Sequence, residues 1–270
     1  MDEKILFTDL DGTLLNDRKE ITPGNMEAIR EALERGHKIV LSTGRALPSA
    51  LNQARLLGLE MEGCYSICYN GACIYDIYKK EIIYYRTFPR EYAIELFKMA
   101  GEQGVHLPAY DDEGVVTLSV NEQVLQYTKN TQLPCRTADS IEEAVKEDCV
   151  KMLAVDYKHQ EPLIRFREAI TEWAQGKVDH YFSCPELLEI VPPGVSKGNA
   201  IRELCGMLRI PPENTISAGD ADNDITMLQA TAVSVVMANA GKHMRQYATY
   251  ITGADNNHDG VAEAIRRFML

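Results

Sequence analysis

The most informative part of this sequence is FTDLDGTLLND, residues 7–17. A short apolar strand pattern over residues 4–8 runs into Asp9 and Asp11, which stand one residue apart and are followed at once by Gly12. Two like charges at the end of a strand repel one another unless a positive group lies between them. The stretch therefore raises the question of whether that group is a metal ion.

The composition limits the size and the partners of the protein. A chain of 270 residues suggests about two domains, and 45% hydrophobic residues can fill ordinary cores. The net charge of −12 and a pI of about 5.0 disfavour binding to nucleic acid or to an anionic membrane. An anionic substrate would therefore need a bound cation or a few local basic side chains.

The sequence shows no signal for export. Its charged start, residues 1–4, lacks the profile of a signal peptide, and no apolar run approaches the roughly 20 residues of a membrane span. Seven scattered cysteines without a C-x-x-C pair favour buried small hydrophobes over a metal cluster at Cys64, Cys68 and Cys73. Reduced thiols and the absent export signal predict a cytoplasmic protein.

Strand and helix patterns alternate in two parts of the chain, which predicts a Rossmann-like, doubly wound parallel sheet of the α/β class. The N-terminal part predicts strands over residues 4–8, 38–42 and 65–69, and helices over 23–36 and 46–57. The C-terminal part predicts helices over residues 198–208, 222–229 and 260–268, and strands over 215–218 and 232–237.

A different pattern fills the middle of the chain. Short Tyr-rich runs follow Asn70-Gly71, and helical patterns then alternate with β-branched runs over residues 91–102, 115–120, 141–147, 150–156 and 161–174. The following Pro192-Pro193-Gly194 suits a stiff linker. We therefore expect an α+β domain, residues 84–189, inserted into a core formed by residues 1–83 and 190–270.

Three further stretches resemble the first in their position at strand ends or helix starts. They are VLSTGR at residues 40–45, GVSKGNA at 194–200 and SAGDADND at 217–224. Ligands bind at the carboxyl ends of the strands of an open α/β sheet, so the four stretches can meet at one site.

The side chains in these stretches suit a site for magnesium and phosphate. Four aspartates supply hard oxygen ligands of the kind that Mg²⁺ prefers, and the absence of His and Cys from the stretches disfavours zinc. These aspartates are Asp9, Asp11, Asp220 and Asp224. Thr43 and Gly44 can offer a hydroxyl and backbone N–H groups to a phosphate near a helix start, and Lys197 is a mobile positive charge.

Each stretch alone also has an ordinary structural interpretation. The paired aspartates can cap a turn, and Thr43-Gly44 can form a strand-to-helix turn. Taken alone, Lys197 is more often a solvated residue at a helix start, and Arg45 is more often a surface or salt-bridge residue. GDADND can form an acidic loop with an N-cap at Asp222. The functional interpretation rests on all four stretches occurring in order, each at the correct edge of its own strand or helix.

These motifs resemble those of the haloacid dehalogenase (HAD) superfamily of phosphohydrolases, and most of all its Cof-type branch. DLDGTLL, STGR, Lys197 in VSKGNAI, and GDADNDITML are similar to the four motifs of the superfamily, and residues 235–265 are similar to the C-terminal segment of the branch. Ser42, Ala221 and the run VSVVMANA depart from the branch without removing a catalytic group. The resemblance implies that residues 84–189 form an α/β cap between the second and third motifs.

The resemblance also implies roles for the site residues. Asp9 is the nucleophile that forms an aspartyl phosphate, and Asp11 protonates the leaving alcohol and then deprotonates the attacking water. Thr43 and Lys197 complete the catalytic set. Mg²⁺ is held by the Asp9 carboxylate, the Asp11 backbone carbonyl and Asp220. The phosphoryl group is bound by Leu10, Thr43, Gly44, Lys197 and Asn223. Arg45 and Asp224 support the site, Asp224 by orienting Lys197 or a metal-bound water.

The activity implied by the resemblance is that of a Mg²⁺-dependent phosphatase of small phosphorylated metabolites, with sugar phosphates as the expected class. A sugar phosphomutase and a non-catalytic sugar-phosphate sensor are the alternatives. Dehalogenation is disfavoured because it has no use for an acid at Asp11 or for a Mg²⁺ site. His106, Tyr110 and Asp111 are candidates for substrate contacts on the cap, although a loop surface explains them as well or better. The sequence predicts no oligomeric state.

Overall fold

The computed structural model describes residues 3–111 and 113–270, and it divides the chain into two compact units. One unit, which we call the core, comprises Met1–Tyr84 and Ser196–Leu270. The other, which we call the inserted unit, comprises Tyr85–Val195. The core is built on a largely parallel sheet with helices, which confirms the predicted α/β class.

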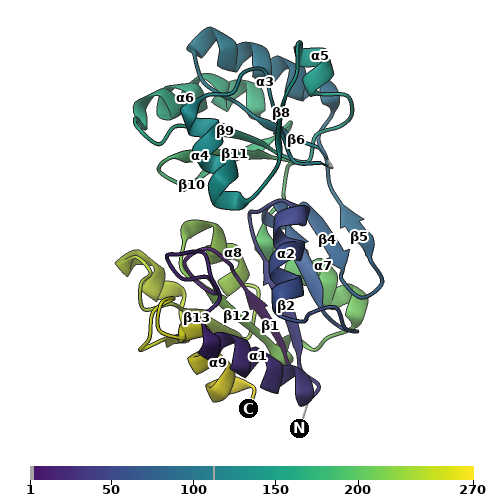
Figure 1. Cartoon of the computed structure of the whole chain (residues 1–270), viewed down its shortest axis with the longest axis vertical. Coiled ribbons are helices and arrows are strands. Elements are labelled where there is room, and N and C mark those ends of the chain that lie inside the picture. The colour runs from purple at the N-terminus through teal and green to yellow at the C-terminus, as the bar shows by residue number, and fades with distance from the viewer. Residues whose placement is uncertain (1–2, 112) are drawn as a thin grey trace. The chain divides into compact units, whose positions relative to one another are not determined.

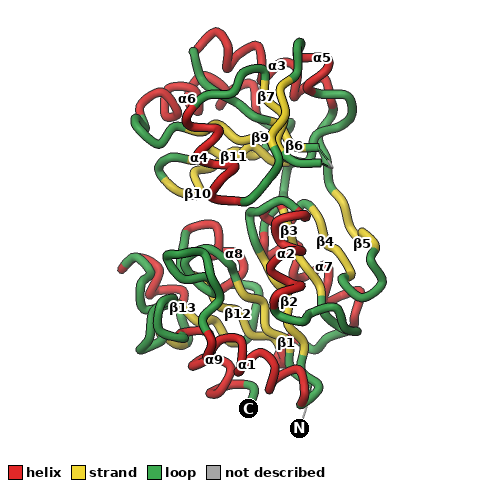
Figure 2. Tube along the Cα trace, viewed as in Figure 1, coloured by secondary structure: helices red, strands yellow, loops and turns green. Residues whose placement is uncertain are grey.

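Eight strands form the sheet of the core, in the order β14-β13-β12-β1-β2-β3-β4-β5 (Figures 1 and 2). Their bounds are β1 Ile5–Thr8, β2 Lys38–Ser42, β3 Tyr65–Cys68, β4 Cys73–Asp76, β5 Glu81–Tyr85, β12 Thr215–Gly219, β13 Val233–Val236 and β14 Tyr250–Ile251. The pairs from β14 to β3 are parallel, and β4 is antiparallel to β3. The chain moves outward from β1 to β3 in one direction and from β12 to β14 in the other. The strand order therefore reverses between β1 and β12, which is where open α/β sheets bind ligands.

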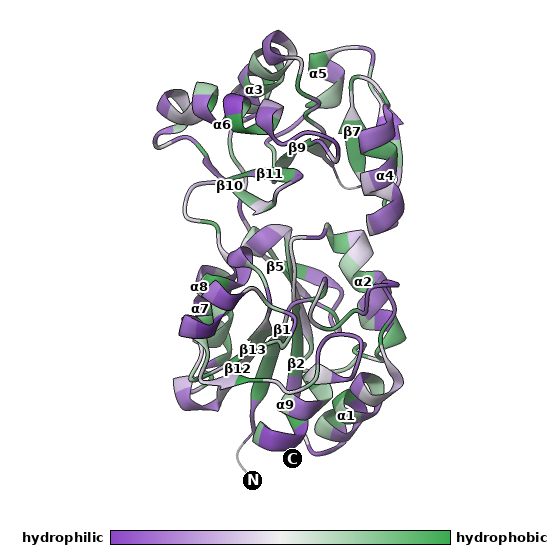
Figure 3. Cartoon of the chain, turned by 90° about the vertical axis from the view of Figure 1, so that its left-hand side faces the viewer, coloured by the Kyte–Doolittle hydropathy of each residue, from purple (hydrophilic) through white to green (hydrophobic). Residues whose placement is uncertain are grey.

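Helices cover both faces of this sheet. They are α1 Pro23–Glu34, α2 Leu47–Leu56, α7 Lys197–Leu208, α8 Ile225–Leu228 and α9 Gly260–Phe268, with 3₁₀ helices η1 Tyr69–Gly71, η2 Pro212–Asn214, η3 Asp222–Asp224 and η4 Lys242–Tyr247. Leu6 of β1 packs in one cluster with Ile29 and Ile265, whereas its neighbour Phe7 packs in another with Ile201. Adjacent strand residues face opposite sides of a sheet, so Ile5, Leu6 and Phe7 of β1 present apolar side chains to both faces. Figure 3 shows this as hydrophobic colour along the central strands.

The inserted unit has its own six-stranded sheet, in the order β10-β11-β9-β6-β7-β8. Its strands are β6 Ala109–Tyr110, β7 Val115–Thr117, β8 Cys135–Thr137, β9 Met152–Val155, β10 Asp179–Cys184 and β11 Leu187–Val191, and its helices are α3 Arg90–Gln103, α4 Glu122–Thr131, α5 Ile141–Ala144 and α6 Glu161–Ala174. The sheet is antiparallel except where β7 pairs with β8. Phe97 of α3 and Phe166 of α6 pack in one cluster with Met152 and Ile190 of the sheet.

Three cysteines of the core lie within its packed interior, whereas Cys205 is half-buried. Cys64, Cys68 and Cys73 are at most 1% exposed, and burial raises the pKa of the Cys64 thiol to about 11 and that of Cys73 to about 12. Among the described residues, no cysteine belongs to a group of three side chains able to hold a metal ion. Within the same part of the chain, none of the helices has the length and apolar character needed to cross a bilayer.

Candidate active site

The four sequence stretches meet at one edge of the core sheet. Asp9 follows β1, Thr43 follows β2 and Asp220 follows β12, while Lys197 is the first residue of α7. Because β1 pairs in parallel with both β2 and β12, the ends of these strands lie side by side. The backbone N–H of Asp9 also donates to the carbonyl of Ala218, at 3.0 Å, which holds the first aspartate against β12.

A buried lysine lies at the centre of the site. Lys197 Nζ lies 2.5 Å from Asp9 Oδ1 and 2.6 Å from Asp224 Oδ1. The three residues are 1%, 5% and 0% exposed, so the charges interact with little screening by water. Burial alone would lower the pKa of Lys197, but Asp224 and Asp9 raise it above its usual value. Lys197 is therefore a fixed positive charge rather than a proton donor.

The same centre contains more negative than positive charge. Asp9, Asp220 and Asp224 each place a carboxylate oxygen within 4.8 Å of the others, as a metal site requires. Burial raises the pKa of Asp9 well above its usual value, although the charge of Lys197 lowers it. Burial, and to a smaller extent the charge of Asp224, raises the pKa of Asp220 to about 7. The carboxylates would be more stable as anions if a further cation were present, so the donor set fits a hard divalent ion.

The hydrogen bonds separate Asp224 from the other two carboxylates. Its Oδ1 accepts from Lys197, and its Oδ2 accepts from the backbone N–H groups of Asp220 and Ala221 at 2.9 and 3.1 Å. Asp220 accepts from the hydroxyl of Thr13, at 2.6 Å. Both oxygens of Asp224 are thus engaged in holding Lys197 and the β12 loop, which leaves Asp9 and Asp220 as the better ligands.

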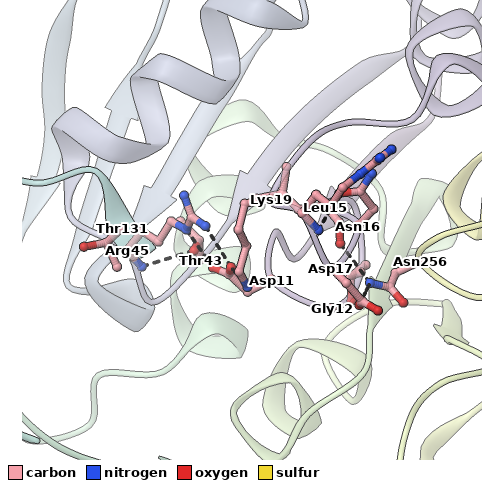
Figure 4. A network of polar contacts seen from close by, with 12 residues as sticks. Asp11, Gly12, Leu15, Asn16, Asp17, Lys19, Thr43, Arg45, Thr131 and Asn256 are labelled. Atoms are coloured by element: carbon pink, nitrogen blue, oxygen red, sulfur yellow. Dashed lines mark hydrogen bonds and ion pairs between the residues drawn. The ribbon is translucent and has the colours of Figure 1, made fainter. Parts of the chain in front are cut away.

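Asp11 does not belong to this acidic group. Arg45 donates two hydrogen bonds to the Asp11 carboxylate, from Nε to Oδ2 at 2.6 Å and from Nη2 to Oδ1 at 2.7 Å (Figure 4). Lys19 Nζ reaches the same Oδ1 at 2.7 Å. Burial alone would raise the pKa of Asp11, but Arg45 and Lys19 lower it to about 2. In this conformation Asp11 is a carboxylate that can accept a proton and has none to donate.

Lys19 was not predicted as a site residue, because it lies outside all four motifs. It has a φ of 63° and lies in the turn between the bridged residues Leu15 and Ile21. A turn lysine has no pattern in the sequence that distinguishes it from a solvated one. Arg45, by contrast, is 4% exposed and contacts Ser49 as well as Asp11, so it is a buried salt-bridge residue rather than a surface residue.

The loop after β2 forms the other side of the site. Thr43 is 1% exposed, and its hydroxyl accepts from the backbone N–H of Arg45, at 3.1 Å. Asn70, which was not predicted as a site residue, packs on this loop, and Asn223 Nδ2 donates to Asn70 Oδ1 at 3.3 Å. Leu10 is fully buried in the hydrophobic core, so only its backbone can contact a ligand.

Two of the three candidate residues of the inserted unit, Tyr110 and Asp111, have structural partners. Arg136 donates to Asp111 Oδ2 from Nε and Nη2, and the backbone N–H groups of Glu113 and Gly114 donate to Asp111 Oδ1. The hydroxyl of Tyr110 is hydrogen-bonded to that of Tyr127. Asp111 therefore organises the turn between β6 and β7.

Comparison with known proteins places the chain in a family. Residues 6–265 match the family of haloacid dehalogenase-like hydrolases. A phosphatase of Streptococcus pyogenes is 34% identical over the full length of both chains, and a pyridoxal phosphate phosphatase of Escherichia coli is 28% identical, again over the full length of both. The chain belongs to the haloacid dehalogenase-like hydrolases, as its motifs predicted.

Solved structures agree with this assignment. A haloacid dehalogenase-like hydrolase from Bacteroides thetaiotaomicron is 30% identical with a TM-score of 0.92, covering 98% of this chain and 99% of its own. A subclass IIB sugar phosphatase of the superfamily is 26% identical with a TM-score of 0.82, covering 98% of both chains. The protein is therefore a phosphoric monoester hydrolase that acts on phosphorylated substrates.

Proposed function

We propose that the protein is a Mg²⁺-dependent phosphatase of small phosphorylated metabolites, with sugar phosphates as its substrate class, and that Asp9 is its nucleophile. The observation that carries the proposal is the contact of Asp9 with buried Lys197 at the point where the strand order reverses. A carboxylate so placed is held in one orientation and meets the ligand at the edge of the sheet.

The acidic group supports the choice of cofactor. The carboxylates of Asp9 and Asp220 and the backbone carbonyl of Asp11 would hold Mg²⁺, while Asp224 stays bonded to Lys197. When bound, Mg²⁺ supplies positive charge that neutralises the carboxylates and the phosphoryl oxygens. Asp9 benefits from this charge, because burial raises its pKa and so disfavours the ionised form that attacks phosphorus.

In the first step we propose that an Asp9 carboxylate oxygen attacks phosphorus and forms the aspartyl phosphate, while the bond to the leaving oxygen breaks. The leaving alkoxide takes a proton from Asp11. In the second step Asp11 accepts a proton from the water that attacks the phosphoryl group, and Asp9 is regenerated. The acid step requires Asp11 to leave Arg45 and Lys19, because their charges hold its pKa at about 2. Release from Arg45 and Lys19 also favours the base step, because a carboxylate with a pKa of about 2 is a weak base.

The remaining residues bind the transferred group. Lys197 balances the charge of Asp9 and the phosphoryl oxygens, and its burial keeps that charge close to the reacting atoms. The Thr43 hydroxyl, the backbone at Gly44 and Leu10, and Asn223 bind the phosphoryl oxygens. We propose that the inserted unit is the cap that selects the rest of the substrate.

Substrate class is tested with a panel of phosphorylated metabolites in the presence of Mg²⁺. The similar sugar phosphatase supports sugar phosphates, and the similar pyridoxal phosphate phosphatase makes pyridoxal phosphate the necessary comparison. We expect release of inorganic phosphate, with the highest kcat/KM on a sugar phosphate. A preference for pyridoxal phosphate would overturn the substrate class, and an isomerised sugar phosphate without phosphate release would indicate a mutase.

A further inference from the structure

The turn η1, which follows β3, has an unusual backbone. Tyr69, Asn70 and Gly71 have φ values of 51°, 57° and 110°. Residues with a side chain rarely adopt this left-handed conformation, and successive ones do so only where the surrounding structure holds them. Strained backbone of this kind is concentrated at functional sites, so the turn calls for a physical explanation.

This turn packs between two parts of the candidate active site. A Cβ on Gly71 would lie 2.3 Å from the carbonyl oxygen of Ser196, which caps the helix that begins at Lys197. The backbone N–H of Asn70 donates to the carbonyl of Thr43, at 3.0 Å. The turn therefore joins the loop after β2 to the start of α7, and these contacts hold Asn70 between them in its left-handed conformation.

The side chain of Asn70 is buried against the predicted phosphate-binding loop. Its exposed fraction is 1%, and a Cβ on Gly44 would lie 2.8 Å from its Oδ1 and 3.2 Å from its Nδ2. Only a glycine at position 44 leaves room for this carboxamide. The Asn70 side chain and the backbone of Gly44 thus form one surface.

One end of this carboxamide has a partner and the other does not. Oδ1 accepts from Asn223, whereas Nδ2 has no hydrogen-bond partner among the described residues. A buried donor without a partner is costly, and native proteins usually satisfy such groups with protein, water or ligand. The carboxamide lies against Gly44 and is bonded to Asn223, two residues expected to bind phosphate, so a bound phosphoryl oxygen would satisfy the donor.

We propose that Asn70 is a substrate-binding residue whose Nδ2 donates a hydrogen bond to a non-bridging phosphoryl oxygen. Its Oδ1 orients Asn223 toward the same group. This inference rests on the proposed function, because it takes the loop after β2 as the phosphate site. It adds to that site a fifth segment of the core, outside the four sequence motifs.

The test is the affinity for inorganic phosphate, measured by calorimetry with Mg²⁺ present and as the inhibition constant against an aryl phosphate. Asn70→Gly keeps the left-handed turn and removes the carboxamide. Asn70→Asp keeps the turn and the acceptor for Asn223 but loses the donor. Gln132→Gly is the matched control, because Gln132 is an exposed carboxamide with a φ of 55° in the inserted unit.

We expect Asn70→Gly to weaken phosphate binding about tenfold, the effect of one lost hydrogen bond to a charged group, and Asn70→Asp to weaken it further. The KM of a substrate should rise in parallel, and Gln132→Gly should bind phosphate like the wild type. Phosphate affinity in Asn70→Gly within about twofold of wild type would overturn the proposal. If both Asn70 variants fail to unfold cooperatively, the carboxamide serves folding, which also contradicts it.

If the proposed function is wrong, the measurements give a result that differs from failure of the Asn70 proposal. Wild-type protein that binds phosphate but hydrolyses no sugar phosphate would overturn the substrate class and leave the Asn70 comparison intact. Wild-type protein that binds no phosphate would overturn both.

Discussion

The two units of this protein each bury a lysine against carboxylates, and the two sites differ in charge balance. In the inserted unit, Lys151 Nζ lies 2.6 Å from Glu189, whose Oε1 accepts from the hydroxyl of Ser183 at 2.8 Å. In the core, Lys197 contacts two aspartates, and Asp220 belongs to the same acidic group. Lys151 and Lys197 are each 1% exposed, so burial does not distinguish the sites.

The difference shows which buried charges can do chemistry. One lysine with one carboxylate forms a neutral pair, whose desolvation is offset within the pair. One lysine among three carboxylates leaves net negative charge in a buried place, which is costly unless a cation binds. The pair in the inserted unit therefore serves packing, and the group in the core is suited to a metal ion and a phosphoryl group.

The largest effect is expected from a change of Asp9, which contacts Lys197 in the core. Asp9→Asn should lower kcat at least about a thousandfold, roughly 4 kcal/mol of transition-state stabilisation, because the amide is no nucleophile. Folding should survive, since the side chains are nearly isosteric and the change relieves repulsion among the carboxylates. Steady-state kinetics and thermal unfolding measure both effects. Turnover close to wild type in an uncontaminated preparation would show that Asp9 is not the nucleophile.

The matching change in the inserted unit should affect stability instead. Lys151→Met leaves Glu189 buried without its partner and should lower the free energy of unfolding by about 3 kcal/mol. The kcat on an aryl phosphate should stay within about threefold of wild type, because the pair has no role in the chemistry. Denaturant unfolding and kinetics on the same preparation test the contrast. A stable protein with a collapsed kcat would break the distinction between the two lysines.

Asp11→Asn should separate the two aspartates of the opening motif. If Asp11 gives Mg²⁺ only its backbone carbonyl, the variant should bind Mg²⁺ like the wild type. Its kcat should fall about a hundredfold on a sugar phosphate and less on an aryl phosphate, whose leaving group needs less protonation. Burst kinetics must accompany the comparison, because slow dephosphorylation would equalise the two substrates. A large loss of Mg²⁺ affinity would instead make the Asp11 side chain a ligand.

A smaller effect is expected when pH changes the stabilisation of the protein by Mg²⁺. The pKa of Asp220 is raised to about 7, above its ordinary 3.8, so the folded protein without metal binds the extra proton between these values. Its contribution to stability is therefore present below about pH 4 and is lost as the pH rises to about 7. Mg²⁺ binding must displace that proton, so the rise in Tm caused by Mg²⁺ should be larger at about pH 8 than at about pH 6. Asp220→Asn should reduce this difference, since the pKa of Asp9 is raised as well, and a pH-independent rise in the wild type would contradict the prediction.

The sequence predicts the core better than the inserted unit, for a physical reason. Strands such as β1 and helices such as α1 carry strong periodic patterns, and the four motifs lie at their ends. In the inserted unit the patterns over 115–120 and 141–147 shorten to Val115–Thr117 and Ile141–Ala144, and α4 and β10 were not predicted. Helix α4 begins after the N-cap Asn121, whose side chain accepts from the backbone N–H of Val124. The helix buries Val124, Tyr127 and Thr128, so it offers few apolar residues from which a helix could be predicted.

The site was predictable wherever a residue lies in a motif. The structure brings Asp9, Lys197 and Asp224 into direct contact, and it turns Asp11 toward Arg45. Lys19 and Asn70 could not be found in this way, because their positions depend on turns that pack against the motifs. In the sequence, Asn70-Gly71 marks only the end of an α/β pattern. The structure shows that its left-handed backbone places Asn70 beside Gly44.

The most direct test of the unbalanced core site is to trap the phosphoryl group on the protein. Asp11→Asn is mixed with a sugar phosphate carrying radiolabelled phosphate, in the presence of Mg²⁺, and is quenched in acid after a fraction of one turnover. We predict that the label is recovered on the peptide that contains Asp9, that EDTA abolishes it, and that Asp9→Asn carries none. Release of the leaving alcohol with no label on the protein, or label on any other peptide, would contradict the account.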